Sequence, residues 1–200
     1  MRLAATGAFA LALVLGAPPT ASAEWQIKPF IGVSFGGGTT FDDFEHAVGH
    51  PNKVFGVNGA LLGDVFGIEA DFGVAPGFFE RGLGKVSSSS VNTLTGNVIV
   101  ALPRSVAEYT LRPYFVGGAG AMFVNVDAFG TPFISRSLKA MDLGGGVTGF
   151  LTDRIGVSWD VRYFRSIDRT FQSGLSLASE QLSFWRANIA VAIRVKGWQK

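Results

Sequence analysis

The sequence predicts an all-β fold, an eight-stranded antiparallel up-and-down transmembrane β-barrel. Three observations carry this prediction: apolar and polar residues alternate in repeated segments, long and short connections alternate between the segments, and the N-terminus resembles an export signal. Hydrophobic residues make up 48% of the sequence, yet beyond the N-terminus they are spread singly along the segments. This distribution favours strands with one apolar face over membrane-spanning helices.

The first 23 residues have the parts of a signal peptide. Arg2 supplies the positive charge, residues 3–16 the apolar segment, and Ala21-Ser22-Ala23 the small-residue cleavage site. We expect residues 1–23 to be removed after export and residues 24–200 to form one outer membrane β-barrel domain. The sequence contains no cysteine, which excludes disulfides, thiolate metal sites and a lipid-modified anchor.

Four strands are expected in the first half of the remaining chain. Each has apolar residues at every second position and ends at a turn that contains Gly or Pro. Ile68 and Phe72, for example, alternate with Glu69 and Asp71, and a strand places such alternating residues on opposite faces. The four strands are residues 25–35, ended by Gly36-Gly37-Gly38; residues 55–61, ended by Gly63-Asp64; residues 66–74, ended by Pro76-Gly77; and residues 94–102, ended by Pro103.

Four more strands are expected in the second half. The clearest pair is a hairpin over residues 141–165, in which Thr152-Asp153-Arg154 forms the turn and apolar residues alternate with Asp160 and Arg162. A helix would scatter Asp160 and Arg162 among the apolar positions. The four strands are residues 109–117, 141–149, 155–163 and 185–195.

Long connections follow the first, third, fifth and seventh strands, and short turns follow the others. Because successive strands run in opposite directions, every second connection lies at the same end of the barrel. We therefore expect the long loops at one end, and the short turns with both mature termini at the other, periplasmic end. The long connections are residues 36–52, the segment after Gly77 that includes residues 87–90, residues 127–136 and residues 166–182.

Alternation alone does not decide which face of each strand points into the barrel. One register carries charges of both signs in the middle of strands, which a narrow lumen would allow to neutralise one another. Aromatic residues recur near strand ends, as in the girdles at two membrane interfaces. The lumen is expected to contain Glu69, Asp71, Arg112, Asp160, Arg162, Arg186 and Arg194, and the girdles Trp25, Phe35, Tyr109, Tyr163, Phe164 and Trp185.

From this orientation we interpret the lumen charges as structural: if Arg162 lies near Glu69 or Asp71, its removal should leave a carboxylate unpaired and lower the thermal midpoint. The apolar row of each strand, which includes Trp159, Val161 and Ile189, should contact acyl chains.

Two segments resemble the small porin-like outer membrane β-barrel family that includes the OmpA- and OmpX-type domains. They are LRPYFVGGAGAMF, residues 111–123, and LGGGVTGFLTDRIGVSWDVRYF, residues 143–164. The resemblance covers about residues 25–195 and implies a monomeric barrel in the outer membrane of a Gram-negative-type cell, with roles from envelope integrity to adhesion. Strands of this family commonly finish on an aromatic residue, whereas here Trp198 is followed by Gln199 and Lys200.

Gly144, Gly146 and Gly149 match the spacing of a dinucleotide-binding fingerprint. That motif needs a helix N-terminus after its strand to hold the pyrophosphate, whereas here a β-turn follows. We therefore interpret these glycines as a packing feature of the strand and expect no cofactor.

A segment with acidic residues and both histidines of the chain is the one dense set of metal-capable side chains: Asp42, Asp43, Glu45, His46 and His50. Carboxylate and imidazole together can bind a divalent ion, but a solvated polar loop is the simpler interpretation, and we assign no metal ligand. A hydrolase would need a nucleophile, a base and an orienting acid. His46, His50 and the loop serines have no diagnostic spacing, so we assign no catalytic residue.

These observations predict an integral outer membrane β-barrel without enzyme activity, with a structural envelope role or a role in interactions of its surface loops. Its expected partners are outer membrane lipid and an extracellular ligand or surface bound by the long loops. The net charge of +2 does not describe a nucleic-acid-binding protein. Two alternatives remain open: a narrow porin-like channel for small solutes, and a soluble secreted lipid-binding β-barrel.

Overall fold

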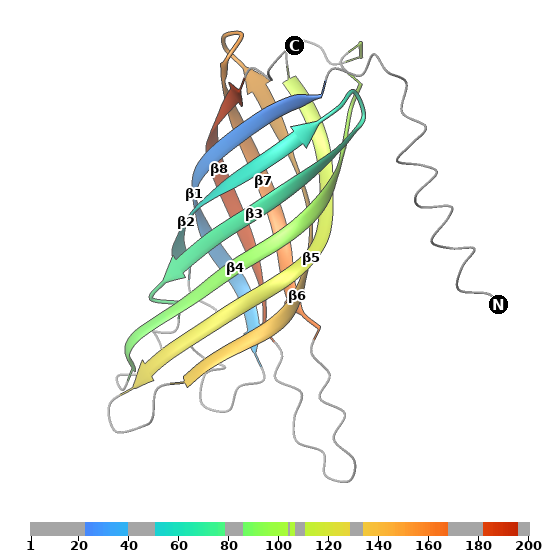
Figure 1. The fold of residues 1–200 in the computed structure, drawn as a ribbon. Coiled ribbons are helices and arrows are strands. Elements are labelled where there is room, and N and C mark those ends of the chain that lie inside the picture. The colour runs from blue at the N-terminus through green and yellow to red at the C-terminus, as the bar shows by residue number, and fades with distance from the viewer. Residues whose placement is uncertain are drawn as a thin grey trace, which may run out of the picture.

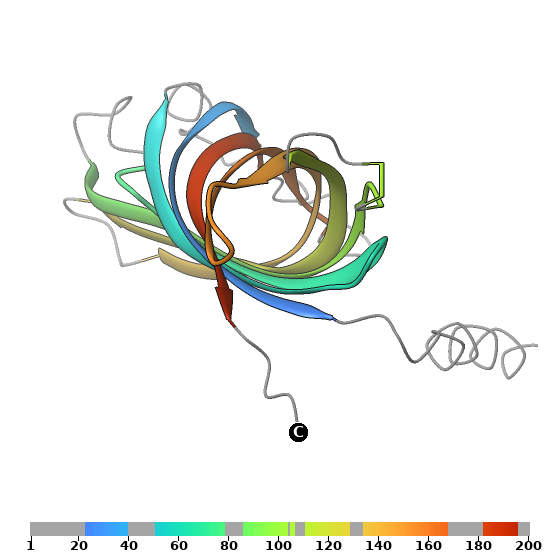
Figure 2. The ribbon, with the colours of Figure 1, turned by 90° about the horizontal axis from the view of Figure 1, so that it is seen from above.

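Eight antiparallel strands close into a barrel in which each strand pairs with its neighbours in sequence and β1 pairs with β8. Figures 1 and 2 show the tilted strands from the side and the ring that they form. The structure is a computed structural model that describes residues 23–39, 51–78, 86–103, 105–106, 111–128, 134–167 and 182–195. This architecture confirms the predicted fold class. Within those ranges, no helix is long and apolar enough to cross a membrane.

The strands follow the order expected from the sequence. They are β1 (Glu24–Thr39), β2 (Asn52–Leu62), β3 (Phe66–Pro76), β4 (Val86–Ala101), β5 (Leu111–Ala128), β6 (Ile134–Phe150), β7 (Ile155–Ser166) and β8 (Leu182–Val195).

Several strands are longer than their alternation predicted. β4 begins at Val86, so it includes residues 87–90, which the sequence analysis placed in a connection. β5 and β6 leave only residues 129–133 between them, and their ladder continues to the pair Val126 and Ile134. Outside the bilayer a strand needs no continuous apolar face, so the alternation ends before the hydrogen-bonded ladder does.

The hairpin of β6 and β7 turns at residues 151–154, as predicted. The side chain of Thr152 accepts a hydrogen bond from the backbone N–H of Ile155 at 2.9 Å. Leu151 and Thr152 both donate their backbone N–H to the carbonyl of Ile155 at 3.0 Å. These hydrogen bonds satisfy backbone groups at the tip of the hairpin, so a connection of four residues is enough to join β6 and β7.

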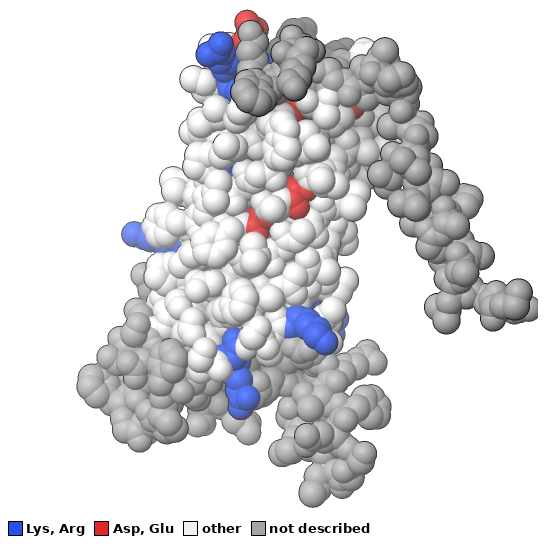
Figure 3. Space-filling view, in the orientation of Figure 1, with Lys and Arg blue, Asp and Glu red and all other residues white. Residues whose placement is uncertain are grey.

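The apolar row of each strand points outward and the charged row points into the lumen. Trp159 is 53% exposed on the outer wall, whereas Arg162 is 0% exposed. Val161 and Ile189 are exposed as well. The orientation inferred from the sequence is therefore confirmed. Figure 3 shows one face of this wall, which is largely uncharged between the two ends.

The lumen contains two apolar clusters with charged residues between them. The cluster toward the long connections is the larger and includes Phe30, Phe78 and Phe164. The cluster toward the short turns includes Leu62 and Tyr114. The buried charged side chains of the described residues are Lys28, Glu69, Asp71, Asp142, Asp160, Arg162 and Arg186.

Gly144 and Gly146 face this crowded interior from β6. A Cβ atom on Gly144 would lie 2.8 Å from Cγ of Arg162, and one on Gly146 would lie 2.8 Å from the hydroxyl of Tyr114. The three glycines of the fingerprint-like motif therefore lie inside a strand, and two of them, Gly144 and Gly146, leave room for lumen side chains. A turn and another strand follow them, not a helix.

Gly144→Ala is expected to lower the free energy of unfolding by about 1–3 kcal/mol, because the new methyl group would clash with the backbone carbonyl of Val161 and with the side chain of Arg162. Gly96→Ala is the matched control, since its Cβ would meet nothing within 4 Å and the change should stay within about 0.5 kcal/mol. Urea unfolding in lipid vesicles, followed by tryptophan fluorescence, measures both. Equal stability of the two variants would contradict the crowding at Gly144.

Candidate functional site

Arg162 lies at the centre of the lumen and joins opposite sides of the barrel. Its Nη1 donates to Oε1 of Glu69 at 2.6 Å and its Nη2 to Oε2 at 3.4 Å, across the lumen from β7 to β3. Its Nε and Nη2 donate to the two carboxylate oxygens of Asp160 at 3.1 and 3.2 Å. Arg162 thus makes two bidentate pairs, the strongest geometry for a guanidinium. Arg162 therefore does lie near Glu69, so the condition stated from the sequence is met.

Further acids and amides surround this guanidinium. Nη1 of Arg162 lies 3.7 Å from Oδ2 of Asp71 and 3.8 Å from Oδ2 of Asp142. The amide of Asn97 donates to Glu69 at 3.3 Å and to Asp142 at 3.2 Å, which links β4 with β3 and β6. The carboxylates are therefore held apart by donors instead of facing one another directly.

Arg186 forms a second layer toward the long connections. Its Nη2 donates to Oδ2 of Asp71 at 2.6 Å, and its Nη1 donates to the hydroxyl of Thr93 at 3.4 Å. Its guanidinium carbon lies 4.7 Å from the ring centre of Phe30 and 4.6 Å from that of Phe164. Phe164 stacks in turn on Phe184 at 5.3 Å. Cation–π contacts and stacked rings fill the lumen at this level.

Lys28 and Tyr114 bound the network toward the short turns. The ammonium of Lys28 lies 4.0 Å from Oε2 of Glu69 and 4.9 Å from the ring centre of Tyr114. The hydroxyl of Tyr114 donates to Oδ2 of Asp160 at 3.2 Å. Beyond these two residues a cavity of about 230 Å³ opens between apolar walls such as Leu62 and Phe150.

Arg112 and Arg194 lie at the turn end and not in the middle of the lumen. Arg112 donates to the backbone carbonyls of Leu102, Gly63 and Asp64 at 2.6 to 2.9 Å. Arg194 donates to Oε1 of Glu24 at 2.6 Å. These two arginines therefore hold turns and strand ends together, while the predicted lumen charges Glu69, Asp71, Asp160, Arg162 and Arg186 meet in the network.

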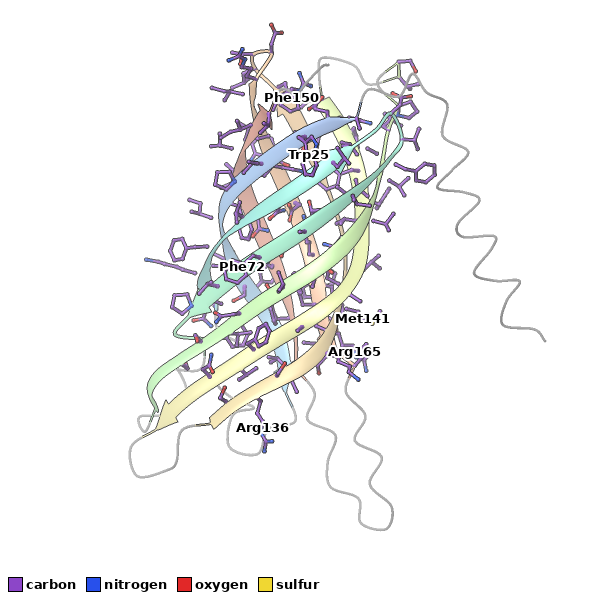
Figure 4. The ribbon with its side chains drawn as sticks, in the orientation of Figure 1. Trp25, Phe72, Arg136, Met141, Phe150 and Arg165 are labelled. Atoms are coloured by element: carbon purple, nitrogen blue, oxygen red, sulfur yellow. The ribbon has the colours of Figure 1, made fainter. Side chains whose placement is uncertain are left out.

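One predicted girdle residue is wrong. Phe164 is 0% exposed and lies in the lumen against Arg186, because it shares the register of Arg162 and not that of Tyr163. Tyr163 and Trp185 do face outward, with ring centres 5.1 Å apart. Trp25 is exposed near the turn end of the wall (Figure 4). Tyr109 lies outside the described residues.

Two charged members of the network were not identified from the sequence. Lys28 and Asp142 both stand on the lumen register of their strands, which was the available signal. The neighbouring lumen positions along each strand are uncharged. No charged row therefore indicated that Lys28 or Asp142 belongs to the network. Their roles follow from their closeness to Glu69 and Arg162 across the barrel.

The metal-capable segment Asp42, Asp43, Glu45, His46 and His50, to which no ligand or catalytic role was assigned, lies outside the described residues. Within the described ranges, no group of three or more His, Cys, Asp or Glu side chains could hold a metal ion. The predicted cleavage site likewise lies outside these ranges, except for Ala23.

Paired charges and aromatic rings occupy the middle of the lumen. Charges of both signs are desolvated together, so each is compensated by hydrogen bonds within the barrel. A solute that moved through the lumen would have to displace the Arg162 pairs and the rings that enclose Arg186. The arrangement is thus suited to holding the strands together, and the wall and loops are left for contact with other molecules.

A family model of the outer membrane protein beta-barrel domain matches residues 7–192. The chain is also similar to the solved structure of Neisserial surface protein A, with 9% identity and a TM-score of 0.59 over 84% of this chain and 96% of that one. It is similar to the N-terminal β-barrel domain of Pseudomonas aeruginosa OprF, with 12% identity and a TM-score of 0.57 over 86% and 97%.

OprG from Pseudomonas aeruginosa is a third similar structure, with 12% identity and a TM-score of 0.51 over 88% of this chain and 98% of that one. At these identities the likeness concerns the fold alone. A search of curated protein sequences found no significant match.

Arg162→Leu is expected to lower the free energy of unfolding by about 3–5 kcal/mol, because Glu69 and Asp160 would keep buried charges without their guanidinium. Arg165→Leu is the control, since it removes an exposed arginine three residues along the same strand and should change stability by less than about 0.5 kcal/mol. Urea unfolding in lipid vesicles measures both. A midpoint of Arg162→Leu equal to that of the unaltered chain would contradict the pairing.

Proposed function

Since the chain belongs to the outer membrane protein β-barrel family, we propose that it is a closed, non-catalytic barrel that supports the envelope and binds partners through its surface loops. Family membership places it in the outer membrane of a Gram-negative-type cell, in contact with lipid. We further propose that residues 1–23 are removed after export, so that the mature chain begins at Glu24, the first residue of β1.

The observation that carries this proposal is the filled lumen. Arg162 occupies its middle with Glu69 and Asp160, and Arg186 lies between two aromatic rings on the loop side. Eight strands enclose a lumen that side chains can fill, so no aqueous path is expected through these layers. A protein of this kind acts through its surface and not through its interior.

The loop end is the part most available to partners. The connections after β1, β3, β5 and β7 all leave the barrel at that end, because the strands alternate in direction (Figure 1). Two of these connections, residues 40–51 and 167–181, are the longest between described strands. Long loops on a rigid barrel are a common arrangement for recognition.

Absence of catalysis is supported by the engagement of the buried carboxylates. Glu69 and Asp160 pair with Arg162, and Asp71 pairs with Arg186. A carboxylate held by a guanidinium is a poor general base, because its lone pairs are already occupied.

The soluble lipid-binding alternative is not compatible with this barrel. Such a protein would carry its apolar residues inside and its charges outside. Here large apolar side chains such as Phe115 and Leu143 are exposed on the wall, while Arg162 and Arg186 are buried. The narrow channel stays as the alternative function.

We expect the purified chain to give no stable conductance steps in planar lipid bilayers, because the two layers of side chains obstruct the lumen. A wide-pore porin in the same bilayers is the positive control, and the mass of the purified product reports whether it begins at Glu24. Reproducible ohmic conductance of the unaltered chain would favour the channel over the closed barrel.

Replacement of residues 40–50 and 168–181 by short Gly-Ser turns tests the role of the loops. In a strain that lacks the chain, we expect uptake of a membrane-impermeant dye to rise severalfold, and only the unaltered chain to restore the barrier. Replacement of turn residues 151–154 by Gly-Ser is the control for insertion. Full restoration by the loop-replaced variant would assign the role to the barrel alone and contradict a function of the loops.

A further inference from the structure

A groove runs over β1 on the outer wall of the barrel, between β8 and β2. On one side Ile31 stands opposite Phe55 and Val33 opposite Lys53; on the other side Val33 stands opposite Ala187. The groove has a volume of about 450 Å³. Its outward-facing lining residues are Ile31, Val33, Lys53, Phe55, Ala187 and Ile189.

The depth of the groove comes from one small side chain. Ala187 stands between Trp185 and Ile189 on the outward face of β8, and both of these are large and exposed. The methyl group of Ala187 leaves the space that a larger residue would fill. The result is an open, largely apolar groove on the wall, in which a hydrocarbon chain would contact several side chains.

Lys53 closes the loop end of this groove with a positive charge. It is the second residue of β2, so it lies where the strand emerges toward the long connections. Its neighbours on the outward face, Val33 and Phe55, are apolar. No acidic partner for its ammonium is found within the described part of the chain. A lysine near the end of a membrane-spanning strand extends its ammonium toward the lipid headgroups, while its aliphatic stem covers apolar surface.

The loop-end charge of the wall is positive beyond this groove as well. Lys139 on β6 and Arg165 on β7 also face outward near the loop end, and Arg165 stands opposite Met141 (Figure 4). Among the acidic side chains that the structure describes, Glu69, Asp71, Asp142 and Asp160 point into the lumen, and Glu24 pairs with Arg194 at the turn end. The described outward side chains of this part of the wall thus include the cations Lys53, Lys139 and Arg165.

We propose that the groove of β8, β1 and β2 binds one phosphorylated lipid of the outer leaflet, with an acyl chain along Ile31, Ala187 and Ile189 and a headgroup phosphate on Lys53. The apolar floor and the cation at its loop end match the two parts of such a lipid in the right order along the membrane normal. The proposal rests on the wall facing lipid, which family membership establishes, and it is independent of the function of the loops.

A second copy of the chain fits this groove less well. Docking about a two-fold axis through the groove would bring the ammonium groups of two Lys53 side chains into one apolar site, and like charges repel there. A phosphate compensates the same charge.

The test uses the full chain in a non-ionic detergent and native mass spectrometry, with diphosphorylated lipid A as the probe. The unaltered chain is expected to retain one lipid. Lys53→Gln should weaken retention at least about tenfold, the loss of one charge-assisted hydrogen bond. Ala187→Phe, which fills the groove, should weaken it similarly. Lipid A without its phosphates should bind weakly and should not respond to Lys53→Gln.

The matched controls are Arg165→Gln, which removes another cation of the loop end, and Ala119→Phe, which enlarges an exposed alanine on β5. Both should retain the lipid as the unaltered chain does. Equal weakening by Arg165→Gln would show diffuse attraction to the whole rim and overturn the site. The site would also be overturned if lipid A with and without its phosphates were retained equally, or if no lipid were retained. A dimer of the unaltered chain that dissociates in Ala187→Phe would assign the groove to a second copy instead.

Discussion

The structure depends on the compensation of charge within a closed, narrow lumen. A buried ion costs several kcal/mol unless opposite charges and hydrogen bonds surround it. Arg162 meets this condition through Glu69 and Asp160, and Arg186 through Asp71 and two aromatic rings. Because Glu69 and Asp71 come from β3, the network links β3 with β7 and β8, with which β3 shares no ladder.

This constraint explains other features of the barrel. The large side chain of Arg162 leaves little space, so Gly144 stands opposite it on β6, and apolar clusters fill the lumen on both sides of the charges. The closed interior in turn directs function to the outside. The wall meets lipid through its apolar row, and the loop end presents the long connections and the outward cations, such as Lys53 and Arg165.

Much of the candidate site could be predicted because the direction of a side chain in a strand depends only on its register. The alternation around Asp160 and Arg162 indicated a charged lumen and an apolar wall, and both are observed. Phe164 was assigned to a girdle from its residue type, although its register is that of Arg162. Lys28 and Asp142 have the lumen register, but they were not assigned to the network because each is the single charge on the lumen face of its predicted segment.

The sequence by itself determined the strands, the face that each turns to lipid and the end at which the long connections gather, because alternation and turn residues are local properties of the chain. Only the tertiary structure decided which charges meet. The pairing of Arg162 with Glu69, 93 residues apart, depends on the tilt and stagger with which β1 closes onto β8, and these arise from all the ladders together. The same closure sets Ala187 beside Val33 and so creates the groove next to Lys53.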